Sequence, residues 1–140
     1  MIYSIIRLLV VISTPIHFKT QSIMDKIFLN NLKIDTIIGI YDWERETLQT
    51  LEFDLEMDWD IAKAAASDDI ADTLDYGAIA QSIVSFVEAS RYQLIETLAE
   101  DVCRLLLTNY PMPKVKLTLS KPVALHGQNL AKIVIERTKK

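Results

Sequence analysis

Residues 51–60 read LEFDLEMDWD, in which apolar and acidic side chains alternate without a break. A period of two places successive side chains on opposite sides of a β-strand, so this segment predicts a strand with one buried and one wet face. Same-face neighbours along a strand lie about 7 Å apart, so the acidic row cannot wrap around one cation. We interpret it as a solvated face, or as the lining of a water-filled channel.

Three more strands are predicted around this one. Residues 27–40 are rich in β-branched side chains and predict a first strand with a kink at Asn30-Asn31. A polar, acidic connecting loop is expected at 41–49. Apolar side chains alternate again at 115–119 and at 133–135, which predicts the third and fourth strands.

Helical signals lie between the two strand pairs. Residues 61–66 are short and favour a helix, and a period of 3.6 predicts longer helices around 79–87 and from 95 to 109. Pro111 ends the last of these. The order β-β-α-α-β-β predicts an α+β fold, a four-stranded antiparallel sheet with two helices on one face. The other face and both edges would stay exposed, so we expect a symmetric homo-oligomer that pairs the edges.

Composition narrows the classes of function. A chain of 140 residues with half of them apolar is one domain, and its net charge of −4 argues against a nucleic-acid partner. Cys103 is the single cysteine, which rules out an intrachain disulfide, and its apolar surroundings indicate a buried side chain. His17 and His126 cannot build a zinc site with one thiol, so we expect no metal and no cofactor.

The first 23 residues differ from the rest of the chain. Their apolar run is too short for a bilayer, which takes about 20 residues, and as an export signal it lacks a suitable cleavage site. We expect residues 1–23 to be an extension outside the core, and residues 24–140 to be the domain. The expected location is the cytoplasm, without a membrane partner.

Four polar residues stand out in this otherwise apolar domain: Glu44, Tyr76, Glu96 and Lys121. Each has an ordinary interpretation. Glu44 can be an exposed loop charge and Tyr76 an aromatic side chain packed on the core. Glu96 can be a carboxylate favoured by the helix dipole, and Lys121 a surface amine. Together they suit a flat, nitrogen-rich substrate and proton transfer. A carboxylate such as Glu96 can accept two parallel N–H bonds, as the 2-amino-4-oxo edge of a pterin or guanine supplies. An amine such as Lys121 can act as a base.

The chain resembles the dihydroneopterin aldolase family. The resemblance runs from Met24 to about Arg137 and rests on four blocks in the right order, which are TIIGIYDWE (36–44), SDDIADTLDY (67–76), LIETLAE (94–100) and LSKP (119–122). It implies the tunnelling fold, in which four-stranded units join into a ring-shaped barrel. It also implies an octamer of two stacked tetramers, with active sites between neighbouring subunits.

The resemblance further implies an aldehyde-lyase of folate biosynthesis, which splits 7,8-dihydroneopterin into 6-hydroxymethyl-7,8-dihydropterin and glycolaldehyde. Glu96 and the backbone at Ile95 would hold the pterin, and Glu44 would face its side chain. Lys121 would be the general acid/base. Tyr76 would lie beside the ring and be catalytic as well, since either Tyr76 or an ordered water would reprotonate the product. A dihydropterin is its own electron sink, so neither a metal nor a Schiff base is expected. Epimerase activity is expected as a side reaction.

Two other functions stay open on the sequence. An epimerase of dihydroneopterin triphosphate shares the fold but should carry more cations near its site. A non-catalytic pterin- or purine-binding oligomer would keep Glu96 without needing Lys121. The loop at 123–129, with His126, leaves the preferred substrate open.

Overall fold

One antiparallel sheet organises the molecule, which is a computed structural model that describes residues 23–123 and 129–140. Its strands lie in the order β1 (Lys26–Thr36), β2 (Gln49–Asp58), β3 (Lys114–Val123) and β4 (Asn129–Thr138). The expected extension, apart from Ile23, and His126 lie outside the described residues. Sequential strands are neighbours throughout, so β1 and β4 form the two edges of the sheet.

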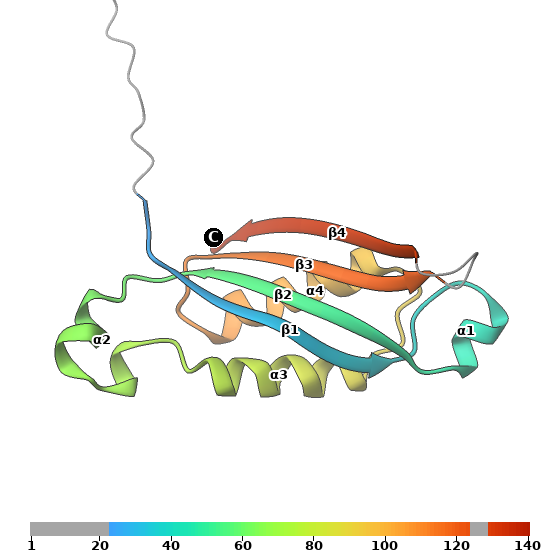
Figure 1. Ribbon diagram of the computed structural model, residues 1–140, viewed down its shortest axis with the longest axis horizontal. Coiled ribbons are helices and arrows are strands. Elements are labelled where there is room, and N and C mark those ends of the chain that lie inside the picture. The colour runs from blue at the N-terminus through green and yellow to red at the C-terminus, as the bar shows by residue number, and fades with distance from the viewer. Residues whose placement is uncertain (1–22, 124–128) are drawn as a thin grey trace, which may run out of the picture.

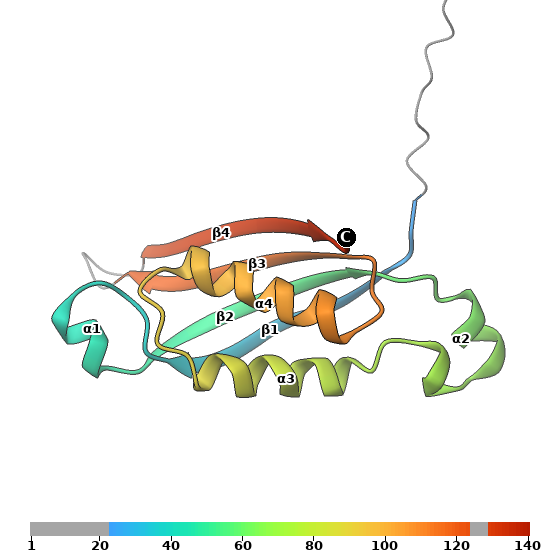
Figure 2. The same ribbon diagram turned by 180° about the vertical axis from the view of Figure 1, so that it is seen from behind.

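Two long helices cover one face of this sheet, as Figure 2 shows from the helix side. They are α3 (Tyr76–Glu88) and α4 (Ile95–Asn109), and the opposite face carries no helix among the described residues (Figure 1). Short elements fill the connections: α1 (Asp42–Glu46), α2 (Ala62–Ser67) and the 3-10 turn η1 (Ile70–Asp72). This arrangement confirms the predicted α+β fold and its order of strands and helices.

The alternating strand β2 is the centre of the core. Leu51, Phe53, Leu55 and Met57 are at most 1% exposed, and the acidic residues between them are half-buried. The helices meet this apolar row with residues spaced by three or four positions: Ile79, Ile83 and Val87 from α3, and Ile95, Leu98, Ala99, Val102, Cys103 and Leu106 from α4. Each fully buried large apolar side chain stabilises the fold by about 1.5–3 kcal/mol.

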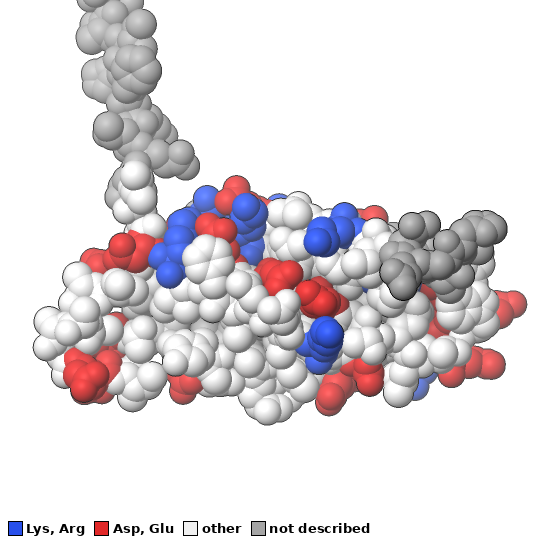
Figure 3. All heavy atoms as spheres, viewed as in Figure 1, with Lys and Arg blue, Asp and Glu red and all other residues white. Residues whose placement is uncertain are grey.

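The open face of the sheet is charged with both signs, as the mixture of red and blue atoms in Figure 3 shows. Lys26 lies 3.2 Å from Glu56 and 2.5 Å from Asp58, and Lys114 lies 3.0 Å from Glu136. Glu56 and Asp58 of β2 therefore pair with Lys26 of β1, and Glu136 of β4 pairs with Lys114 of β3. This confirms the predicted wet face of β2.

Two predictions for the N-terminal half need correction, and one is confirmed. β1 ends at Thr36, not at residue 40, and residues 42–46 form the helix α1 where a loop was expected. The five residues of α1 carry no apolar period, so a helix of this length left no pattern to detect. The expected kink is present: the register shifts between Leu29 and Leu32, and Asn31 has a φ of 59°.

The remaining sequence predictions concern burial and membranes. Cys103 is fully buried, as expected, and burial raises the pKa of its thiol to about 12, so it is not a nucleophile at neutral pH. None of the helices in the described ranges has the length and apolar character needed to cross a membrane.

Candidate active site

A pocket of about 740 Å³ opens at the end of the molecule that carries α1. One wall comes from residues 39–44 and the other from residues 93–96, at the start of α4. Lys121 and Pro122 of β3, with Ala131 of β4, close it from the sheet. Four of the five predicted site residues therefore line one pocket: Glu44, Ile95, Glu96 and Lys121.

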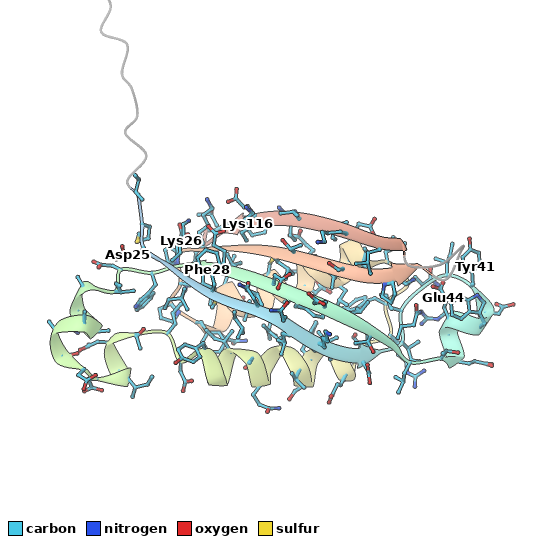
Figure 4. All side chains as sticks on the ribbon, viewed as in Figure 1. Asp25, Lys26, Phe28, Tyr41, Glu44 and Lys116 are labelled. Atoms are coloured by element: carbon cyan, nitrogen blue, oxygen red, sulfur yellow. The ribbon has the colours of Figure 1, made fainter. Side chains whose placement is uncertain are left out.

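Glu44 is held at the base of the first wall by the short helix that carries it. It is the third residue of α1, and its carboxylate accepts a hydrogen bond of 3.1 Å from the backbone N–H of Tyr41. A side chain that reaches back in this way satisfies an N–H group at the start of the helix. Figure 4 shows Tyr41 and Glu44 together at this end. The interpretation of Glu44 as an exposed loop charge is wrong, since it is 5% exposed.

The ammonium of Lys121 donates to the second oxygen of that carboxylate at 2.5 Å. The two side chains are 16% and 6% exposed, so the ion pair is largely shielded from water. Burial alone would raise the pKa of Glu44, but the bonds from Lys121 and from Tyr41 N–H outweigh it and hold the pKa below its ordinary value. Glu44 is therefore a carboxylate at neutral pH.

The backbone beside this pair requires a glycine. Gly39 has a φ of +125°, a conformation that residues with a side chain rarely adopt. A Cβ atom at this position would lie 2.1 Å from the carboxylate of Glu44. The absence of a side chain at Gly39 is what lets Glu44 sit under the loop and reach Lys121.

Glu96 belongs to the opposite wall, in the first turn of α4. It is exposed and lines the pocket, next to Ile95, which is 8% exposed. No side chain caps this helix at Leu94. A free carboxylate and uncapped backbone groups at a pocket wall can bind the polar edge of a planar heterocycle.

Tyr76 does not lie in this pocket. It is the first residue of α3, directly after the helix-capping Asp75, and it is 59% exposed. That end of α3 adjoins α2, whereas α1 and the pocket lie at the other end of the sheet (Figures 1 and 2). Within one chain the structure thus brings four of the predicted residues together and separates the fifth.

The pocket also has an apolar rim that residue-by-residue reading of the sequence missed. Ile40, Tyr41, Trp43 and Leu94 are between 48% and 60% exposed and surround the polar groups. In the sequence, two aromatic residues in a short polar segment, Tyr41 and Trp43, could have indicated this rim. An apolar rim with a few convergent polar groups is the usual form of a site for a small flat ligand. Within the described residues no cluster of His, Cys, Asp and Glu could hold a metal ion.

Comparison with known proteins gives consistent results. A family model described as dihydroneopterin aldolase (FolB) matches residues 27–138. The chain is 47% identical over 114 residues to the dihydroneopterin aldolase of Escherichia coli, covering 81% of this chain and 93% of that protein. It is 39% identical to the Haemophilus influenzae enzyme over 113 residues, which are 80% of this chain and 96% of that one.

Comparison of the fold with solved structures also finds a dihydroneopterin aldolase. The crystal structure of the Escherichia coli dihydroneopterin aldolase in complex with neopterin superposes with a TM-score of 0.78. That comparison covers 81% of this chain and 99% of the crystallised one.

Proposed function

The chain belongs to the dihydroneopterin aldolase family of folate biosynthesis, and on that basis we propose which of its residues carry out the aldol cleavage. The observation that carries the proposal is the pocket in which Glu44, Lys121 and Glu96 converge. It offers an anchoring carboxylate on one wall and a shielded amine–carboxylate pair on the other.

Binding begins at the wall formed by α4. The carboxylate of Glu96 accepts the N–H bonds of the 2-amino edge of the pterin, and the backbone at Ile95 contributes a further contact. The ring lies along the apolar rim, which Trp43 and Leu94 help to form. In this pose the polar side chain of the substrate extends toward Glu44 and Lys121.

Cleavage requires a base near that side chain and an electron sink. In its free-amine form Lys121 accepts the proton of the hydroxyl on the second side-chain carbon and becomes an ammonium, and Glu44, 2.5 Å away, orients it. The bond between the first and second side-chain carbons then breaks and releases glycolaldehyde. The electrons of the broken carbon–carbon bond enter the C=N bond of the dihydropterin. The reaction therefore needs neither a Schiff base to the enzyme nor a metal.

The enol-like product must be protonated on carbon, and we assign Tyr76 to this step. Since Tyr76 lies away from the pocket of its own chain, the phenol comes from a neighbouring subunit. Among the described residues β1 and β4 have no further strand beside them, and this supports such an assembly because exposed edges are commonly paired or covered. We propose a homo-octamer of two stacked tetramers, located in the cytoplasm.

The pocket favours an unphosphorylated substrate. Lys121 is the single cation among the described residues that line it, and a triphosphate would need several. Epimerisation by re-addition of glycolaldehyde to the opposite face is expected to accompany cleavage.

The test is to incubate the purified protein with 7,8-dihydroneopterin and to measure glycolaldehyde and 6-hydroxymethyl-7,8-dihydropterin. A parallel reaction uses 7,8-dihydroneopterin triphosphate. Formation of both products from the first substrate supports the proposal. Pterin binding without glycolaldehyde would instead support a binding protein, and epimerisation of the triphosphate alone would support the epimerase.

A further inference from the structure

Arg45 joins the two walls of the pocket without lining it. Its guanidinium donates to the carbonyl of Gly39 at 3.0 Å, to that of Tyr92 at 2.9 Å and to that of Arg91 at 2.7 Å. Gly39 belongs to the wall that carries Glu44. Tyr92 directly precedes the segment 93–96, which forms the wall that carries Glu96.

Each of the two segments is otherwise fixed to a different part of the fold. The phenol of Tyr92 donates to Asp101 in α4, and Thr36 of β1 donates to the carbonyl of Ser90 at 3.1 Å. These contacts tie the second wall to α4 and to the sheet. Glu44 is instead fixed through α1 and Lys121. Two of the three bonds of Arg45, those to Tyr92 and Arg91, cross from α1 to the second wall, and the third holds Gly39 in the first wall.

We propose that Arg45 is a positioning residue that sets the distance between Glu44 and Glu96. An arginine suits this role because its planar group is always charged and offers five N–H donors in a fixed geometry. Charge-assisted bonds, of which those to Gly39 and Tyr92 are part-buried, resist the separation of the walls. The inference rests on the proposed function, in which one ligand must reach both walls.

Because one ligand must reach both walls, a change in their separation should affect ligands of different length differently. A purely structural role of Arg45 would not produce this difference. Neopterin, the oxidised and uncleavable form, has both the 2-amino edge for Glu96 and the hydroxylated side chain for Glu44. Guanine has the same amino edge without the side chain and reaches only the α4 wall. Loosening the walls should therefore weaken neopterin binding and spare guanine binding.

The experiment measures dissociation constants of both ligands by isothermal titration calorimetry for the wild-type protein, Arg45→Met and Arg45→Lys. We expect Arg45→Met to weaken neopterin binding about tenfold and guanine binding by less than about twofold, as the loss of one or two charge-assisted contacts implies. Arg45→Lys, which keeps the charge but not the fork, should fall between, near threefold. Arg137→Met, on β4 with its side chain 43% exposed and paired with Glu100, is the matched control and should change neither constant.

Unchanged neopterin binding in Arg45→Met, or an equal loss for both ligands, would overturn the positioning role. If Arg45→Met does not fold, Arg45→Lys decides by the same comparison, and unchanged neopterin binding in that variant would overturn the role. A wild-type protein that binds neither ligand would refute the proposed function, and the inference with it. The two failures are therefore distinguishable.

Discussion

Lys121 and Glu44 lie 77 positions apart in the sequence and 2.5 Å apart in the structure. The bond links the end of β3 to the short helix α1 and is shielded by the pocket walls. Buried ion pairs lose much of their attraction to desolvation, so a pair of this kind adds little stability beyond that of apolar packing. Its position in a pocket whose opposite wall carries a second carboxylate, Glu96, indicates chemistry.

Replacing the proposed base should remove turnover and leave binding. In Lys121→Ala we expect kcat to fall at least about a hundredfold, the usual contribution of general acid–base catalysis. Neopterin binding should stay within about tenfold, because Glu96 still holds the ring. Steady-state kinetics and calorimetry check the two parts separately. Lys116→Ala is the control, since Lys116 lies on the same strand and has a register partner in Glu136. Substantial turnover in Lys121→Ala would contradict the assignment.

Removing Glu96, the proposed anchor of the ring, should weaken binding more than it lowers turnover. Glu96→Ala removes the carboxylate that we propose accepts two N–H bonds of the ligand, so we expect neopterin binding to weaken about ten- to a hundredfold. Turnover at saturating substrate should fall much less. Glu100→Ala, one turn further along α4 and paired with Arg137, serves as the control. A loss of kcat at unchanged affinity would assign Glu96 a different role.

The two glycines at element boundaries should respond differently to alanine. Gly39→Ala combines an unfavourable φ with a Cβ placed on the Glu44 carboxylate, and we expect a loss of about 1–3 kcal/mol in the free energy of unfolding. Gly77→Ala, in the first turn of α3, should stay within about 1 kcal/mol because alanine favours a helix. Chemical denaturation measures both. Equal effects would mean that the Gly39 conformation is not required.

The pairing of Glu44 predicts a pH dependence of stability. The pKa of Glu44 is lower in the folded state than its ordinary value of 4.5, so its contribution is complete above pH 4.5 and is lost as the pH falls through the folded pKa. We therefore expect Glu44→Gln to cost about 1–3 kcal/mol at pH 7 and less at about pH 3, below the ordinary pKa. Denaturation curves of both proteins at both pH values provide the test. A difference that grows on acidification would have the wrong sign.

A mixture of two inactive variants should recover activity if Tyr76 serves a neighbouring subunit. Random assembly of Tyr76→Phe with Lys121→Ala in equal amounts gives complete sites at about a quarter of positions, since each site takes one residue from each of two chains. Activity assays after co-expression measure this recovery. In the control mixture, Glu96→Ala with Lys121→Ala, both lesions lie in the same chain's pocket. At low substrate concentration the specific activity of that mixture should not exceed the mean of the activities of its two parent variants.

Failure of the first mixture to exceed its parents would place Tyr76 outside the site. If activity recovers in both mixtures, residues other than Tyr76 also reach the site from a neighbouring subunit.

The alternation at 51–57 was sufficient to predict the central strand and, with the two helical periods, the fold. Local pattern could not predict α1, because a helix of five residues held by polar side-chain bonds leaves no apolar period. The convergence of Glu44 and Lys121 was equally invisible to local pattern, and only the resemblance to a family pointed to it. The contacts of Arg45 had no signal at all, since its partners are backbone carbonyls, which every residue has.

The placement of Tyr76 at the far end of α3 from the pocket has a kinetic consequence. A lone folded copy cannot complete the proposed catalytic set from its own atoms. Specific activity should therefore decline on dilution into the range where the assembly dissociates and return on reconcentration. In that range protein concentration would itself limit the rate of the proposed reaction.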